Sequence, residues 1–217
     1  MGIPRGEPYI WVTWLPKLLV GEAHCQWALW FRAHYRHEKV PSTLDTVLWC
    51  AQHTALVEKT DQALRNEGWT VTVEDQNRFA LHGTRTPVTV AGKPDLVAIK
   101  GDVVRVIDCK TGAPKGSDCM QVLIYMLLLP WVRPECRDRR VYGEVRYAEG
   151  LQVIEPSELT EGLQAHIWRA IRQAADTNPP PKVPSPRGCR FCDVTAADCD
   201  ARVELQPEYE GAAPDML

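Results

Sequence analysis

The chain has 217 residues, of which 45% are hydrophobic and 24% are charged, with a formal net charge of −3 at pH 7. This length and composition indicate one sizeable hydrophobic core with appendages, and the net charge argues against a surface that is basic throughout. The longest apolar run, residues 122–129, is too short to cross a bilayer, and the first residues lack the pattern of a secretory leader. We therefore expect a cytoplasmic protein without membrane contact, whose eight cysteines are thiols or metal ligands.

The first 40 residues are expected to form an N-terminal helical segment. An extended entry and a short helix occupy residues 1–20. The helical spacing of Trp27, Trp30 and Phe31 then predicts a helix over residues 22–37, with Cys25 near its first turn. We expect these aromatic rings to pack in the interior.

A long helix is predicted from a cap at Ser42 or Thr43 to about Asn66. His53 lies in the middle of this helix. A lone histidine in such a place is usually a core or surface residue, so helical position by itself gives it no role. Three strands are expected next, at about residues 70–74, 79–82 and 88–91.

Residues 92–112 predict a β-hairpin, because two apolar strands are joined by a Gly-Asp pair at 101–102. With that pair as the loop, the antiparallel register places Asp95 directly opposite Asp108. Opposed residues in such a ladder have Cβ atoms about 4.5–5.5 Å apart, and like charges at this distance destabilise the pair. A divalent metal ion between the two carboxylates is the simplest compensation.

Lys110 follows Asp108 by two residues, so both side chains are expected on one face of the strand. Two carboxylates and a cation around Mg²⁺ or Mn²⁺ are suited to polarising a phosphate and lowering the pKa of a bound water. This pattern favours phosphodiester hydrolysis. The alternative is an exposed hairpin whose charges face solvent.

An almost entirely apolar helix is predicted from a Ser117 or Asp118 cap to the residue before Pro130. Gln121 and Tyr125 are four residues apart and therefore share one face of this helix. A buried helix with a single polar stripe usually turns it towards another polar group, so we expect these two side chains to face the hairpin. Alternatively, they satisfy each other or a backbone group.

The remaining elements complete the predicted fold. A strand is expected at residues 141–148 and a helix at 158–176, followed by a stiff proline-rich connector at 178–186. Helices packed on a mixed sheet make an α/β core.

Three cysteines near the end of the chain, Cys189, Cys192 and Cys199, have the spacing C-x2-C-x6-C in a segment with no predicted helix or strand. Such a segment needs ligands to be ordered, and the three thiolates need a fourth ligand. A 4Fe-4S cluster and a tetrahedral zinc ion both accept four thiolates, and spacing does not decide between them. From the residues alone, the fourth ligand is a histidine or one of Cys25, Cys50, Cys109, Cys119 and Cys136.

Pro94-Asp95 followed by Asp108-Cys109-Lys110 resembles the signature of the PD-(D/E)XK nucleases, and more closely their RecB-like branch. The third acidic position is Asp108 where the written pattern often has Glu, a change that this branch commonly accepts. The resemblance implies a restriction-endonuclease-like α/β core, a mixed sheet flanked by helices. It also implies cleavage of DNA with Mg²⁺ or Mn²⁺.

The resemblance also implies roles for single residues. Asp95 and Asp108 would hold the metal with help from His53, which matches the upstream helical histidine of the RecB-like branch. The backbone carbonyl of Cys109 is a further candidate ligand. In this interpretation Lys110 orients or activates the attacking water.

Gln121 and Tyr125 match the Gln-x-x-x-Tyr motif of the same branch. That match implies that the two side chains lie beside the metal and orient the DNA.

Four cysteines clasp the nuclease core in one iron–sulfur subset of this branch. The resemblance to that subset selects Cys25 as the partner of Cys189, Cys192 and Cys199 and favours a 4Fe-4S cluster over zinc. The division expected from it is an N-terminal segment, a nuclease core, a connector with clasp and a disordered tail, at residues 1–40, 41–177, 178–203 and 204–217.

The chain most resembles the small exonucleases of CRISPR adaptation, and next the nuclease domains of AddB-type helicases. That comparison implies trimming of single-stranded DNA ends before spacer acquisition, beside a CRISPR integrase complex. A phage or DNA-repair nuclease of the same family fits the same residues. A non-catalytic iron–sulfur subunit that binds DNA and a redox protein that uses the cluster itself are the other hypotheses.

Overall fold

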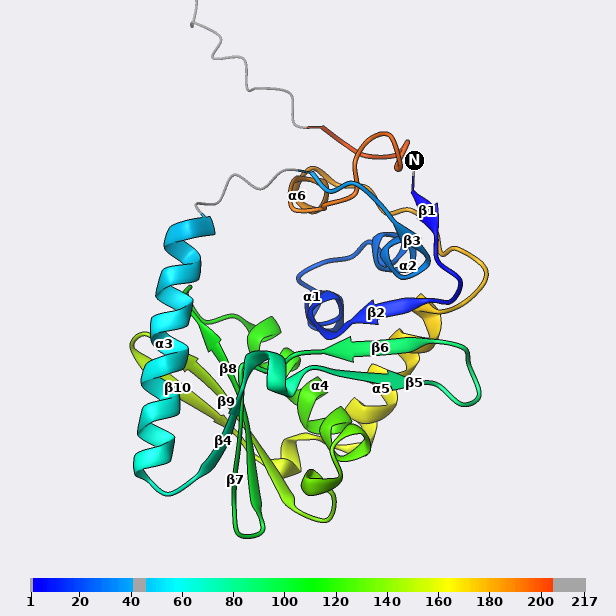
Figure 1. Ribbon diagram of the computed structural model, residues 1–217. Coiled ribbons are helices and arrows are strands. Elements are labelled where there is room, and N and C mark those ends of the chain that lie inside the picture. Colours follow the sequence, from blue (N-terminus) through cyan, green and yellow to red (C-terminus); the bar gives the residue numbers. More distant parts are fainter. Residues whose placement is uncertain (1, 41–45, 205–217) are drawn as a thin grey trace, which may run out of the picture.

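The computed structural model describes residues 2–40 and 46–204 of the chain, which form an α/β structure of mixed sheets flanked by helices (Figure 1). The predicted fold class is confirmed. In the described part of the chain, no helix is long and apolar enough to cross a membrane. The domain boundaries expected at residues 40, 177 and 203 stay predictions.

The larger sheet has five strands in the order β10-β9-β8-β7-β4. Its central pair, β8 and β9, is parallel, and the other pairs are antiparallel. The strands are β4 (Thr70–Val73), β7 (Leu96–Lys100), β8 (Val103–Lys110), β9 (Arg140–Tyr147) and β10 (Gly150–Ile154).

The predicted hairpin is confirmed as β7 and β8. Lys100 pairs with Val103 at the loop, and the ladder continues outward to Leu96 and Ile107. The loop glycine, Gly101, has a φ of 59°, the left-handed conformation that glycine adopts without steric cost.

A second sheet has the order β2-β6-β5, in which β2 (Tyr9–Trp11) is parallel to β6 (Thr89–Gly92) and β5 (Phe79–His82) is antiparallel to it. The three strands expected after the long helix are thus divided between two sheets, because β4 joins the larger one. A two-stranded sheet pairs β1 (Ile3–Pro4) with β3 (Tyr35–Arg36).

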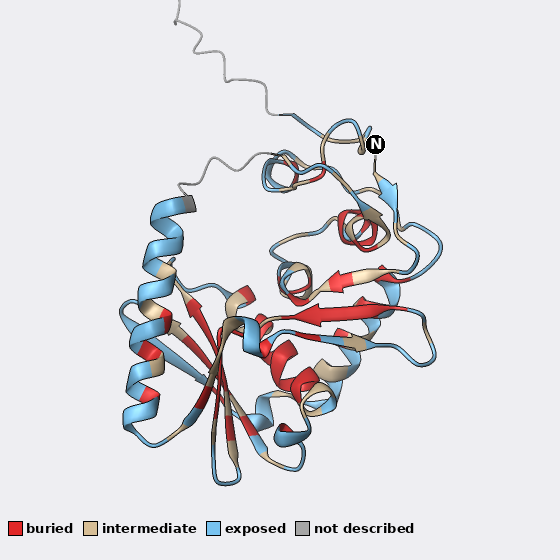
Figure 2. Ribbon diagram, viewed as in Figure 1, coloured by how far each residue is buried: buried red, intermediate tan, exposed pale blue. Residues whose placement is uncertain are grey.

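Helix α4 (Gly116–Val132) is buried without a break over residues 121–129 and contacts strands of both larger sheets (Figure 2). Two details of the prediction were wrong. The N-cap is Lys115, whose backbone N–H donates to Asp118 Oδ2 at 3.0 Å, and the helix runs through Pro130. Proline lacks an N–H, but the backbone N–H of Arg133 still donates to Leu129 O and closes the last turn.

Helix α3 (Thr46–Asn66) lies along the larger sheet and buries Val57 and Leu64 against it. The predicted caps at Ser42 and Thr43 fall outside the described residues. The first turns of α3 are exposed, whereas buried residues occur only farther along it (Figure 2). The side chains of α3 that lie near the hairpin thus belong to a helix that is anchored by its second half.

The remaining helices are shorter and lie against both sheets and against one another. Helix α2 is shorter than the predicted 22–37, and α5 is shorter than the predicted 158–176. A short helix, unpredicted, carries Cys189. The helices are η1 (Val12–Trp14), α1 (Pro16–Leu19), α2 (Gln26–His34), η2 (Glu74–Asn77), η3 (Pro134–Cys136), η4 (Pro156–Glu158), α5 (Glu161–Ala174) and α6 (Pro186–Arg190).

Candidate active site

Two buried carboxylates lie where β7 begins and β8 nears its end. Asp95 directly precedes β7 and Asp108 is the sixth residue of β8, at the next step of the ladder beyond Leu96 and Ile107. Asp95 is 9% exposed and Asp108 is 2% exposed. Carboxylates so far from water need partners, since burial of an unpaired charge is costly.

The partners of Asp95 come from α3 and β8. Asp95 Oδ2 accepts a hydrogen bond from the backbone N–H of Cys109 at 2.7 Å and lies 3.2 Å from His53 Nε2. The helical histidine is thus brought to the hairpin, as the resemblance implies. The Cys109 thiol is buried, and this burial raises its pKa to about 12, so it stays protonated at neutral pH.

The partners of Asp108 come from its own strand and from α4. Lys110 Nζ lies 2.5 Å from Asp108 Oδ2, and Gln121 Nε2 donates to Asp108 Oδ1 at 2.7 Å. Lys110 Nζ also donates to Gln121 Oε1 at 3.2 Å. Gln121 therefore uses both ends of its amide to hold the acid and the cation in one arrangement.

Burial and charge act against each other in this pair. Burial raises the pKa of Asp108, the positive charge of Lys110 opposes the rise, and the negative charge of Asp95 adds to it. Burial alone would lower the pKa of Lys110, yet the charge of Asp108 and their hydrogen bond outweigh burial and raise it. Lys110 is therefore a cation, and Asp108 is an acid that a second positive charge would readily deprotonate.

The His53 ring is held from two sides. Its hydrogen bond with Asp95 raises the pKa of His53, and the opposing effect of burial is smaller. Its other contact is the indole of Trp49, one helical turn earlier in α3, stacked at 5.4 Å between centroids with 21° between the planes. Sequence reasoning missed Trp49, because the sequence shows Trp-x-x-x-His only as a pair of residues on one helix face.

Tyr125 completes the polar stripe of α4. Its hydroxyl lies 3.5 Å from Gln121 Nε2 and donates to Lys93 O at 3.3 Å. Burial raises the pKa of Tyr125, with a smaller contribution from the charge of Asp108, so the phenol stays neutral. The structure therefore combines the two alternatives for this stripe, because Gln121 faces Asp108 while Tyr125 bonds to the backbone beside Asp95.

Asn77 is a residue of this site that sequence reasoning missed. Only 1% exposed, it donates from Nδ2 to the carbonyls of Thr72, Pro94 and Asp95 at 2.9, 3.2 and 3.3 Å. Its Oδ1 accepts from Thr72 Oγ1 at 2.6 Å and from Arg133 Nη1 at 2.8 Å. One side chain thus fixes the backbone that carries the first catalytic candidate.

The model of the PD-(D/E)XK nuclease superfamily matches residues 19–197. The chain belongs to the PD-(D/E)XK nuclease superfamily. A solved structure titled "Crystal structure of SSO0001" has a similar fold, with 17% identity, coverage of 92% of this chain and 89% of that chain, and a TM-score of 0.50. At this identity the likeness shows the fold alone, and no curated protein gives a match.

PD-(D/E)XK nucleases typically use Mg²⁺ or Mn²⁺, and the donor set of this chain fits such an ion. Across residues 2–40 and 46–204, no three His, Cys, Asp or Glu side chains are arranged to hold a metal together. Mg²⁺ does not need three, because it is usually held by one or two carboxylates together with waters and substrate phosphates. Two buried, mutually repelling carboxylates, Asp95 and Asp108, provide that minimum.

The four predicted cluster cysteines lie in the region of α2 and α6. Cys25, Cys192 and Cys199 all pack against the buried group of Trp27, Trp30, Phe31 and Val194. Burial raises the pKa of Cys199, and the nearby Cys25 and Cys192 add to the rise. In the described residues, which include all eight cysteines, no disulfide is formed. These cysteines are among the described residues, in which no three potential ligands are arranged to hold a metal, so the four-cysteine clasp stays a prediction.

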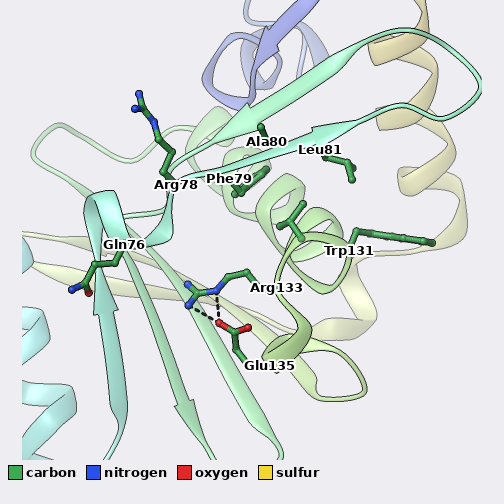
Figure 3. Close-up of a pocket in the computed structure, with 9 residues that line it drawn as sticks. Gln76, Arg78, Phe79, Ala80, Leu81, Trp131, Arg133 and Glu135 are labelled. Carbon is green, nitrogen blue, oxygen red and sulfur yellow. Dashed lines mark hydrogen bonds and ion pairs between the residues drawn. The ribbon is translucent and has the colours of Figure 1, made fainter.

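A shallow cavity of about 480 Å³ adjoins the site between η2, β5 and the end of α4 (Figure 3). Arg133 lies at its wall and is held by Glu135, with 2.7 Å from Nε to Oε1, as the dashed lines show. The same guanidinium reaches Asn77. Phe79 lines the cavity and contacts the Tyr125 ring edge-on at 6.2 Å. The cavity is thus linked to the site only indirectly, from Arg133 to Asn77 and from Phe79 to Tyr125.

Proposed function

We propose that the chain is a metal-dependent deoxyribonuclease that acts as an exonuclease on the ends of single-stranded DNA. The observation that supports this most is the buried pair of Asp95 and Asp108 with Lys110 at 2.5 Å from the second acid. A purely structural ion pair would need one carboxylate for one lysine. The second carboxylate, Asp95, takes no part in that ion pair. It accepts from the backbone N–H of Cys109, contacts His53 and provides further oxygen donors for a divalent cation.

Asp95 and Asp108 are the proposed metal ligands, together with His53 and the backbone carbonyl of Cys109. A divalent cation bound there polarises the attacked phosphate and lowers the pKa of a bound water. Lys110 keeps its proton, so it neutralises charge that develops on the phosphate and orients the attacking water.

Gln121 and Tyr125 are the proposed positioning residues. Gln121 holds the Asp108 carboxylate and the Lys110 ammonium in a fixed relation. Tyr125 carries a neutral hydroxyl beside them, which suits a hydrogen bond to a substrate oxygen. Both roles are compatible with their burial, because the side chains cannot rotate away from the carboxylates.

The experiment for this proposal is cleavage of end-labelled single-stranded and duplex DNA by anaerobically purified protein with Mn²⁺, Mg²⁺ or a chelator. Asp108→Ala and Lys110→Ala should lose cleavage, while Asp102→Ala, a change at the exposed hairpin loop, should keep it. Cleavage by the wild type only with metal, shortening strands progressively from an end, is the expected result. Internal cuts without progressive shortening would replace the exonuclease by an endonuclease.

Trimming of DNA for CRISPR spacer acquisition, beside an integrase complex, is the pathway that we propose for this activity. The resemblance of the chain to small CRISPR-adaptation exonucleases supports it. A phage or DNA-repair nuclease has the same chemistry. Stimulation of trimming by an integrase complex, absent with unrelated DNA-binding proteins, distinguishes the first pathway from the other two.

A second candidate function is that of a non-catalytic iron–sulfur subunit that binds DNA within a larger complex. The observation that supports this candidate is that Cys25, Cys192 and Cys199 all pack against one buried, mainly aromatic group. A 4Fe-4S cluster, with zinc as the alternative metal, would be held by these three and Cys189. If the wild type, Asp108→Ala and Lys110→Ala are equally inert while all three bind DNA, this candidate replaces the nuclease.

A further inference from the structure

Trp49 is a large aromatic side chain that the structure leaves 47% exposed directly beside the candidate active site. It lies in the first turns of α3, where residues 47–50 are all exposed. One helical turn later His53 contacts Asp95, and the indole stacks on the His53 ring at 5.4 Å. Only one aromatic ring therefore separates Trp49 from a carboxylate of the site.

The exposed position of the Trp49 ring contributes little to the stability of the fold. An exposed indole loses the free energy that burial of its apolar surface would provide, and α3 has a buried face that begins farther along the helix. A stack on His53 alone explains one side of the indole. It leaves the exposed remainder of a flat π-surface at the place where a strand bound to Asp95 and Asp108 would continue.

We propose that Trp49 is a stacking platform for one unpaired nucleobase of the DNA strand, next to the phosphate held at the carboxylates. The inference rests on the proposed nuclease function and adds a nucleobase subsite to it. Stacking between a base and an aromatic side chain contributes about 1–3 kcal/mol per base and tolerates any sequence. Such a contact suits an enzyme that removes successive nucleotides, because each new base meets the same surface.

The charge near Trp49 is compatible with this ligand. The Lys110 ammonium lies 2.5 Å from Asp108 Oδ2 and provides positive charge beside the position proposed for the phosphate. A base stacked on the outer part of the indole would place its phosphate towards His53 and the proposed metal position. Binding at Trp49 does not require a partner with a strongly acidic surface. An apolar peptide is a poorer candidate for this position than DNA, because it would gain nothing from the neighbouring carboxylates.

The test is a double-mutant cycle between the protein and the DNA. Each single-stranded oligonucleotide carries one abasic position, which is moved stepwise along the strand from one oligonucleotide to the next. Fluorescence anisotropy measures their binding to the Asp108→Asn protein. Their cleavage is measured with the wild type. At one position, removal of the base and Trp49→Ala should each weaken binding and kcat/KM by about 5- to 150-fold, and together by no more than either alone. Trp49→Phe should restore part of the loss.

Trp131 provides the matched control, because it is 67% exposed and lies ten residues beyond Gln121 on α4, about 15 Å along the axis. Trp131→Ala should leave the abasic profile unchanged. If Trp49→Ala lowers binding equally for every oligonucleotide, the ring only supports His53 and the inference is overturned. Position-dependent binding without cleavage would overturn the nuclease and keep the subsite, whereas absence of both would overturn the two together.

Discussion

His53 and Asp95 lie 3.2 Å apart, from Nε2 to Oδ2, although 42 residues separate them in the chain. The contact joins the middle of α3 to the start of β7. Because Val57 and Leu64 anchor the second half of α3, the position of His53 relative to the Asp95 carboxylate is fixed. Helix α3 thereby contributes a side chain to the site.

His53→Ala should therefore weaken metal-dependent cleavage by about 10- to 100-fold, because it removes a proposed metal ligand that also orients the Asp95 carboxylate. The loss should appear as a higher Mn²⁺ concentration at half-maximal rate. His166→Ala, which removes an exposed histidine of α5, is the control and should leave the metal titration unchanged. An unaltered Mn²⁺ midpoint in His53→Ala would remove His53 from the metal site.

The raised pKa of Asp108 makes a prediction about stability. The folded protein keeps this proton to higher pH than the unfolded chain, so the folded state binds more protons between the two pKa values. Without a divalent cation, the free energy of unfolding should fall as the pH rises from the usual carboxyl pKa, near 4, through the raised pKa. Denaturant unfolding at several pH values in chelator measures this slope.

Asp108→Asn should flatten the slope, because it removes the titrating group and keeps the shape. The raised pKa of His53 acts in the same direction but is present in both proteins. Saturating Mg²⁺ should also flatten the slope in the wild type, since the ion binds the deprotonated acid. Equal slopes in wild type and Asp108→Asn would contradict the burial argument.

Local patterns account for the parts of the fold that were predicted. The hairpin follows from a glycine that accepts positive φ between two apolar runs, and once the loop is placed at Gly101 the period of two brings Lys110 to Asp108. The same reasoning found the polar stripe of α4. These features depend on neighbours within a few residues.

The parts that were missed depend on distant segments. Strand β10 escaped because Leu151 and Val153 are exposed on an edge strand, so no buried alternation marks it. The separation of β4 from β5 and β6 is decided by which strand each one meets, and Asn77 looks like an ordinary turn residue until Arg133, 56 residues away, covers it. Propensity does not contain that information.

Gln121→Glu is expected to harm activity more than Tyr125→Phe. The new carboxylate would face Asp108 Oδ1 at the 2.7 Å distance where the amide now donates, so a hydrogen bond becomes a repulsion. Loss of the Tyr125 hydroxyl removes only longer contacts, of 3.3 and 3.5 Å. Single-turnover cleavage rates at saturating Mn²⁺ compare the two, and a reversed order would shift the catalytic role to Tyr125.

Asn77→Ala should reduce both stability and cleavage, because it removes the side-chain donor to the Pro94 carbonyl and one of two donors to the Asp95 carbonyl, which also accepts from the Glu74 N–H. Each buried polar group that loses its partner costs about 1–3 kcal/mol. Thr89→Val is the control, since Thr89 is also buried and hydrogen-bonded, to Glu7 at 2.7 Å, but lies in β6. Chemical denaturation should show losses in both variants.

Only Asn77→Ala should also raise the Mn²⁺ requirement, because it alone loosens the backbone of Asp95. A lower stability with an unchanged metal titration would make Asn77 a purely structural residue.

Cys192→Ala should lower thermal stability more than it lowers the rate of cleavage per folded molecule. Four thiolates on one cluster would tie Cys25 to residues beyond the nuclease core, and closing so long a loop removes disorder from the unfolded chain. Iron, sulfide and zinc content of the anaerobically purified wild type identifies the bound metal. The control is Cys50→Ala, an exposed thiol on α3, which should change neither metal content nor melting temperature. Full thermal stability in Cys192→Ala would mean that the clasp does not hold the chain ends.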